Sequence, residues 1–134
     1  MEPTLDEVKE WLQKAHNDLR SAQILTEHRP PVLDTACFHC QQAVEKTLKA
    51  FLAWQTVPFE KVHNLTYLLD LCEAQESGFD AMRMQAEALA PYAVETRYPG
   101  PVIEIPQEQA QEALEAAQII WDFMLRLLPN ETHP

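Results

Sequence analysis

Two lysines one helical turn apart in a predicted central helix have the chemistry to bind an anionic group. Lys46 and Lys49 are three residues apart, so both ammonium groups can lie on one side of a helix. Glu45 stands four residues before Lys49, in the order that favours an ion pair worth about 0.2–0.5 kcal/mol. The spacing leaves two interpretations open: a solvated helical stripe with one salt bridge, or a phosphate-binding pair.

A rigid turn later in the chain carries a second set of candidate residues. Arg97 and Tyr98 stand directly before Pro99 and Gly100. A guanidinium can bind a phosphate in bidentate fashion and a tyrosine ring can stack on a ligand. Alternatively, the arginine caps helical carbonyls and the tyrosine packs as a lid. Two interpretations also remain for His63: its ring can form a hydrogen bond with a loop carbonyl, or it can belong to the same polar site.

The distribution of charge indicates where an anion would bind. The chain holds 10 basic and 21 acidic residues, a formal net charge of −11. Residues 31–65 balance three acids with three bases, and residues 97–103 hold one base and no acid. The other regions are acidic, so broad electrostatic binding of nucleic acid is not expected. We therefore predict one ligand site, formed by Lys46, Lys49 and Arg97 with Glu45, His63 and Tyr98 nearby.

The cysteines favour packing over chemistry. Cys37 and Cys40 form a CxxC motif, but no strand precedes it as a thioredoxin-type site requires. A zinc site would need two further ligands, for which Cys72 and His63 are weak candidates. We predict no metal and no cofactor. Three cysteines, and no apolar leader at the N-terminus, predict a reduced cytoplasmic protein, and no apolar run is long enough to span a membrane.

Helical periodicity accounts for the elements that must position these residues. Only 2 of the 134 residues are glycine, which argues against an all-β fold. Apolar residues at steps of three and four predict helices near residues 4–26, 35–55, 65–75, 80–89 and 106–128. Thr4 with Glu7, Asp34 and Asn64 are the predicted N-terminal caps. We predict an all-α, up-and-down antiparallel bundle of about five helices, one domain over residues 1–134, with 130–134 as a disordered tail.

Several short motifs, in this order, resemble the HEPN (higher eukaryotes and prokaryotes nucleotide-binding) domain family over nearly the whole chain. The first motifs lie in the first two predicted helices, the next at the start of the third, and the last in and ahead of the turn that holds Arg97. Their residues are Trp11, Ala15, Asp18, Leu19, Ala22, Phe38, Gln41, Gln42, Ala43, Glu45, Lys46, Leu48, Lys49, Ala50, His63, Asn64, Leu65, Leu68, Leu69, Tyr92, Thr96, Arg97, Tyr98 and Pro99. The resemblance implies a helical bundle, commonly a homodimer. It also implies a minimal nucleotidyltransferase partner in a two-component, toxin–antitoxin-like system.

The resemblance implies two activities, nucleotide binding and metal-independent RNA cleavage. The cleaving relatives carry an arginine followed four to six residues later by a histidine. After Arg97 the next histidine is His133, so the motif is absent. Without that histidine, proton transfer in such a reaction lacks a participant.

We therefore favour a binding module over an enzyme and predict no catalytic residue. A ribonuclease toxin using Arg97 with His63, and a purely structural or interaction protein, remain the alternatives.

Overall fold

The structure is a computed structural model, and it describes residues 5–93 and 104–134. Its helices are α1 (Leu5–Glu27), α2 (Leu33–Trp54), α3 (Leu65–Gln75), α4 (Arg83–Leu89) and α5 (Gln107–Leu127), with the short 3-10 helices η1 (Ser77–Met82), η2 (Ala90–Ala93) and η3 (Asn130–Thr132). These described residues contain five α-helices and no strand, which confirms the predicted all-α bundle.

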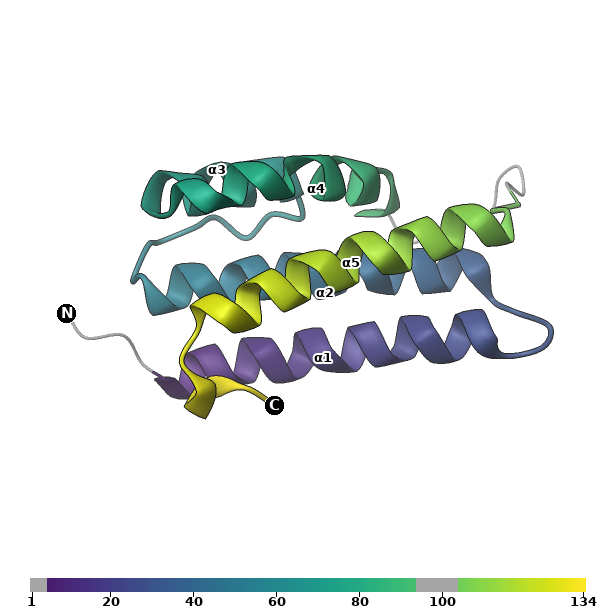
Figure 1. Ribbon diagram of the computed structural model, residues 1–134, viewed down its shortest axis with the longest axis horizontal. Coiled ribbons are helices and arrows are strands. Elements are labelled where there is room, and N and C mark those ends of the chain that lie inside the picture. Colours follow the sequence, from purple (N-terminus) through teal and green to yellow (C-terminus); the bar gives the residue numbers. More distant parts are fainter. Residues whose placement is uncertain (1–4, 94–103) are drawn as a thin grey trace.

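Helix α2 is the centre of the bundle. It packs against α1, α3 and α5, and it also contacts α4 and η2. In Figure 1, α1 lies on one side of α2, while α3 and α4 form a layer on the other side. Because α2 has neighbours on several sides, most of its residues are buried, including some polar ones.

A return connection (residues 55–64) determines where α3 begins. It runs back along α2 instead of turning directly into an antiparallel helix (Figure 1). His63 therefore lies beside Glu45, in the middle of α2, and not beside the end of α2 at Trp54. Further along α3, the Cys72 thiol lies 3.7 Å from the Leu48 carbonyl oxygen. Helix α3 thus runs in the same direction as α2.

Local sequence explains most helix boundaries. Asn64 caps α3 as predicted, since its side-chain oxygen accepts a hydrogen bond from the Tyr67 amide at 3.1 Å. The predicted N-cap of α2 is wrong, because the helix begins at Leu33 and Val32 is the capping position. Asp34 lies in the first turn instead, where a carboxylate is favoured by the helix dipole. Of the predicted capping box, Thr4 lies outside the described residues.

The chain after α5 differs from the prediction. Residues 130–134 were expected to be a disordered tail, but 130–132 form η3, which packs against α1. Thr132 is buried, and its hydroxyl donates a hydrogen bond to the Pro129 carbonyl at 2.6 Å. The His133 ring lies 3.1 Å from the carbonyl oxygen of Leu128, near the end of α5. Burial against α1 and these local bonds give this segment its order.

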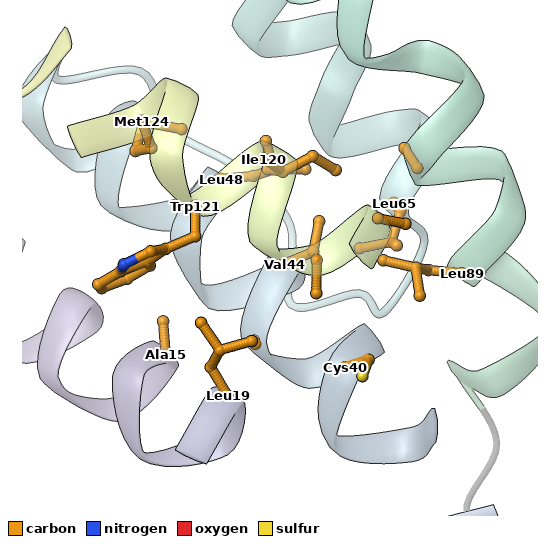
Figure 2. Packing of buried hydrophobic residues seen from close by; sticks show 14 of the residues in the cluster. Ala15, Leu19, Cys40, Val44, Leu48, Leu65, Leu89, Ile120, Trp121 and Met124 are labelled. Carbon is orange, nitrogen blue, oxygen red and sulfur yellow. The ribbon is translucent and has the colours of Figure 1, made fainter. Parts of the chain in front are cut away.

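The apolar faces of all five α-helices form one continuous core (Figure 2). Cys37, Cys40 and Cys72 are free thiols in this core. Burial raises the pKa of Cys37 to about 11 and that of Cys40 to about 12. The interpretation of the CxxC pair as core residues is confirmed. Within the described ranges, no group of three or more His, Cys, Asp or Glu residues is placed to hold a metal.

Within residues 5–93 and 104–134, no helix has the length and apolarity needed to cross a membrane.

Candidate functional site

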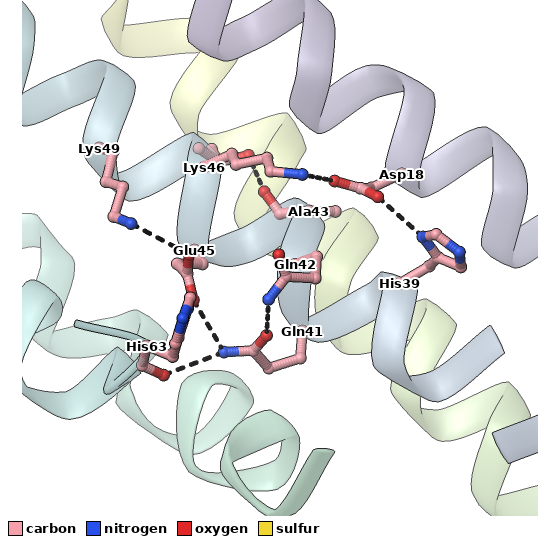
Figure 3. A network of polar contacts seen from close by, with 10 residues as sticks. Asp18, His39, Gln41, Gln42, Ala43, Glu45, Lys46, Lys49 and His63 are labelled. Atoms are coloured by element: carbon pink, nitrogen blue, oxygen red, sulfur yellow. Dashed lines mark hydrogen bonds and ion pairs between the residues drawn. The ribbon is translucent and has the colours of Figure 1, made fainter. Parts of the chain in front are cut away.

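The polar face of α2 carries two carboxylate-centred clusters (Figure 3). We call them the Glu45 cluster, which joins α2 to the start of α3, and the Asp18 cluster, which joins α2 to α1. In each cluster one carboxylate holds a lysine on one oxygen and a histidine on the other. Two sites of the same construction therefore lie side by side on the central helix.

The Glu45 cluster consists of Glu45, Lys49, His63 and Gln41. The Lys49 ammonium lies 3.0 Å from Glu45 Oε2, and His63 Nδ1 lies 2.9 Å from Glu45 Oε1. Gln41 donates to the His63 carbonyl oxygen at 3.1 Å and to Glu45 Oε1 at 3.4 Å. Gln42 in turn donates to Gln41 Oε1 at 2.7 Å. His63 of the return connection thus supplies partners for two buried polar residues of α2, Gln41 and Glu45.

Lys49 is enclosed by aromatic rings as well as by its carboxylate. Its ammonium lies 5.4 Å from the centre of the Trp11 ring and 5.8 Å from that of Phe59. These rings contact each other edge to face, with centroids 6.4 Å apart. A cation over aromatic faces is stabilised by their quadrupoles. The ammonium is therefore held inside the protein, and its direct role is to hold Glu45.

The Asp18 cluster consists of Asp18, His39 and Lys46. The Lys46 ammonium lies 2.5 Å from Asp18 Oδ2, and His39 Nδ1 lies 2.8 Å from Asp18 Oδ1. Asp18 is buried between α1 and α2, whereas both partners are partly exposed. A carboxylate on α1 thereby fixes two side chains of α2.

The carboxylates determine which nitrogen of each ring donates a hydrogen bond. An ionised carboxylate accepts hydrogen bonds and does not donate them, so Nδ1 of each histidine is the donor. In a neutral ring the other nitrogen, Nε2, then carries a lone pair. No residue within 5–93 or 104–134 makes a hydrogen bond with Nε2 of His39 or His63. In its neutral form, each ring therefore offers Nε2 as a hydrogen-bond acceptor.

A hollow of about 480 Å³ opens next to the Glu45 cluster at the beginning of α3. Its lining includes the three polar residues His63, Asn64 and Thr66 and the small side chains of Ala90 and Ala93. The His63 side chain is 69% exposed. A ligand in this hollow would therefore meet a carboxylate-oriented imidazole and the first turn of a helix.

The structure brings some predicted site residues together and separates others. Glu45, Lys49 and His63 share one cluster. Lys46 does not join Lys49, because the two ammonium groups bind carboxylates on different elements. Arg97 and Tyr98 lie outside the described residues.

The two clusters also contain three residues that were not predicted for the site: Asp18, His39 and Gln41. Asp18 is a buried acidic residue within the mostly apolar stripe of α1, next to buried Leu19. His39 and Lys46 are seven residues apart on α2, which places them on the same face of the helix. A buried acid on one helix and two basic side chains on one face of the next were the signals available.

Comparisons with known proteins agree with this architecture. The model of the HEPN domain matches residues 8–128. A protein of Methanocaldococcus jannaschii named "Putative toxin MJ1304" is 27% identical over an alignment 136 positions long, which covers 87% of this chain and 87% of that protein.

Two crystal structures share the fold. TT1696 from Thermus thermophilus aligns with a TM-score of 0.74 and 30% identity, covering 90% of this chain and 98% of that one. ST0689, an archaeal HEPN homologue, aligns with a TM-score of 0.68 and 22% identity, covering 90% and 96%. The family model spans nearly the whole chain, and the chain belongs to the HEPN domain family.

Proposed function

We propose that this HEPN protein binds a nucleotide or another phosphorylated ligand on the polar face of α2. We further propose that it works with a minimal nucleotidyltransferase in a toxin–antitoxin-like pair. The Methanocaldococcus jannaschii relative, whose name contains the word toxin, supports the second part. The first part is carried by one observation: a carboxylate-oriented histidine, His63, lines a hollow at the start of a helix.

The physical chemistry of this corner favours an anion. The amides of the first turn of α3 carry the positive end of the helix dipole. The Asn64 side chain already caps the Tyr67 amide, and the earlier amides of the turn have no partner within the helix. A phosphate there would also meet the Thr66 hydroxyl, if that side chain turns into the hollow that it lines.

The six predicted site residues would then have different roles in binding the ligand. His63 would contact the ligand, while Glu45 and Lys49 would hold its ring. Lys46 keeps two further N–H donors beyond its bond to Asp18, and they would bind phosphate oxygens. Arg97 and Tyr98 are proposed as additional contacts on the basis of the sequence alone.

Isothermal titration calorimetry with ATP and GTP tests the binding proposal. We expect His63→Ala and Lys46→Ala to weaken binding at least fivefold, because each removes one polar contact. His28→Ala and Lys9→Ala are the matched controls, since both residues are exposed and lie outside the two clusters. Equal affinities in all four variants would remove the proposed site.

The partner proposal has its own test. Co-expression with the product of a neighbouring nucleotidyltransferase reading frame should yield a complex that co-purifies. Light scattering on the isolated chain would report whether it forms the homodimer that the family resemblance implies. A monomeric protein that does not co-purify with the nucleotidyltransferase would contradict the paired-system proposal. Ligand binding would still be tested separately by calorimetry.

A second candidate function, RNA cleavage, is favoured by the Glu45–His63 pair. A histidine oriented by a buried carboxylate is the arrangement that general-base catalysis uses. Incubation with single-stranded and structured RNA would detect it. Cleavage that is lost in His63→Ala and kept in His28→Ala would support a ribonuclease, whereas no cleavage by the natural sequence would exclude it under those conditions.

A further inference from the structure

The Asp18 cluster has the features of a binding site that the predicted set of residues does not include. Asp18 uses one oxygen for Lys46 and the other for His39, so both partners are held in fixed positions. Their side chains are 23% and 27% exposed, which leaves part of each in contact with solvent. Phe38 packs edge to face against the His39 ring, with centroids 5.8 Å apart, and further limits its motion.

The two basic side chains of the cluster have complementary chemistry. The Lys46 ammonium donates and is positively charged, so it matches a phosphate oxygen. Nε2 of neutral His39 accepts, since Nδ1 donates to Asp18. A ligand that satisfies both presents an acceptor oxygen, best an anionic one, and a hydrogen-bond donor such as a hydroxyl. A ribose phosphate carries these two groups close together.

A brace between α1 and α2 is the simpler explanation of the same contacts, and it differs in one respect. A brace uses both bonds to Asp18, but it makes no use of the second ring nitrogen of His39, for which the described residues supply no partner. The cluster also lies close to the Glu45 cluster on the same helix. His39 precedes Glu45 by six residues, which places these two residues about 9 Å apart along the axis of α2 and about 120° apart around it.

We propose that Asp18, His39 and Lys46 form a second contact for the ligand of the α2 face. Lys46 binds a phosphate oxygen, His39 Nε2 accepts a hydrogen bond from a ribose hydroxyl, and Asp18 holds both side chains. This inference rests on the proposed nucleotide binding and adds the ligand class, a ribonucleotide in preference to a deoxyribonucleotide. His39 and Asp18 are the residues that it adds to the site.

Calorimetry with ATP and with its 2′-deoxy and 3′-deoxy analogues tests the inference. The natural sequence should bind ATP about threefold to tenfold more tightly than at least one deoxy analogue, as expected for one hydrogen bond. His39→Ala should bind ATP and that analogue equally. His39→Gln, whose side-chain oxygen can accept a hydrogen bond, should recover part of the preference. His28→Ala is the control, and thermal melts verify that each variant is folded.

The possible results separate this inference from the proposal beneath it. If the natural sequence binds none of the nucleotides, both fall. If it binds ATP and both analogues equally, or if His39→Ala keeps the full preference, nucleotide binding stands and the His39 contact is wrong. If His63→Ala weakens ATP and the analogue in proportion while His39→Ala removes only the preference, both are supported.

Discussion

Replacing Lys49 with methionine should destabilise the protein far more than breaking an exposed ion pair of the same length. The Lys49–Glu45 and Arg83–Asp70 pairs both have a nitrogen–oxygen distance of 3.0 Å. They differ in burial: the side chains are 9% and 3% exposed in the first pair, and 27% and 62% exposed in the second. Distance is therefore matched, and the surroundings of the charges are the variable.

The magnitude follows from the carboxylate that remains. In Lys49→Met, Glu45 stays buried with His63 and Gln41 as its hydrogen-bond donors and with no permanent positive charge beside it. Removing one partner of a buried pair costs about 3–5 kcal/mol. We expect about 3 kcal/mol, because the other donors remain. For a chain of this size that lowers the melting temperature by roughly 10 °C.

Thermal unfolding followed by circular dichroism at pH 7 measures the effect. Asp70→Asn should melt close to the natural sequence, since exposed pairs are screened by solvent. The double variant Glu45→Leu, Lys49→Met should recover much of the loss, because no buried charge is left unpaired. A Lys49→Met melting temperature within about 2 °C of the natural one would refute the claim that burial sets the strength of this pair.

Three further predictions concern single sites outside that pair. Thr56, with φ of 55°, occupies the left-handed position after α2, where the amides of Thr56 and Val57 donate to the carbonyls of Ala53 and Leu52. Because glycine adopts this backbone conformation without a steric penalty, Thr56→Gly should raise the free energy of unfolding by about 1 kcal/mol in urea titrations. Asn64→Ala should lower it by about 1 kcal/mol in the same assay by removing the cap of α3. The pKa of the Cys40 thiol is 9.0 in the unfolded chain and is raised to about 12 by burial, so the free energy of unfolding should fall as the pH rises from 9 towards 12. Cys40→Ala should reduce the slope of that fall by about 1.4 kcal/mol per pH unit.

The helices could be predicted because their signals are local. Apolar spacing identified all five α-helical regions, and the Asn64 cap fixed the start of α3. The exact starts failed where two signals competed. Asp34 is a good capping residue, yet the helix begins two residues earlier than predicted, at Leu33. Similarly, the predicted helix over 80–89 is divided into η1 and α4, because a tighter turn precedes Arg83.

The site could be predicted only in part because its bonds join distant positions. Glu45 and Lys49 are four residues apart, and their pairing follows from helical geometry. His63 reaches Glu45 over 18 residues and Lys46 reaches Asp18 over 28. Those contacts depend on the return connection and on the packing of α1 against α2. Neither leaves a periodic signal in the sequence.

The central position of α2 also sets the order in which the bundle should come apart. Amide hydrogens exchange with solvent through local openings at the edges of a fold and through complete unfolding at its centre. Helix α4 is only seven residues long and has 3-10 turns at both ends, so its amides should exchange first. Those of α2 should be the last to exchange. Native-state exchange would then find α2 still packed on α1 while outer helices open, so His39, which Asp18 of α1 holds, would keep its orientation through most fluctuations of the protein.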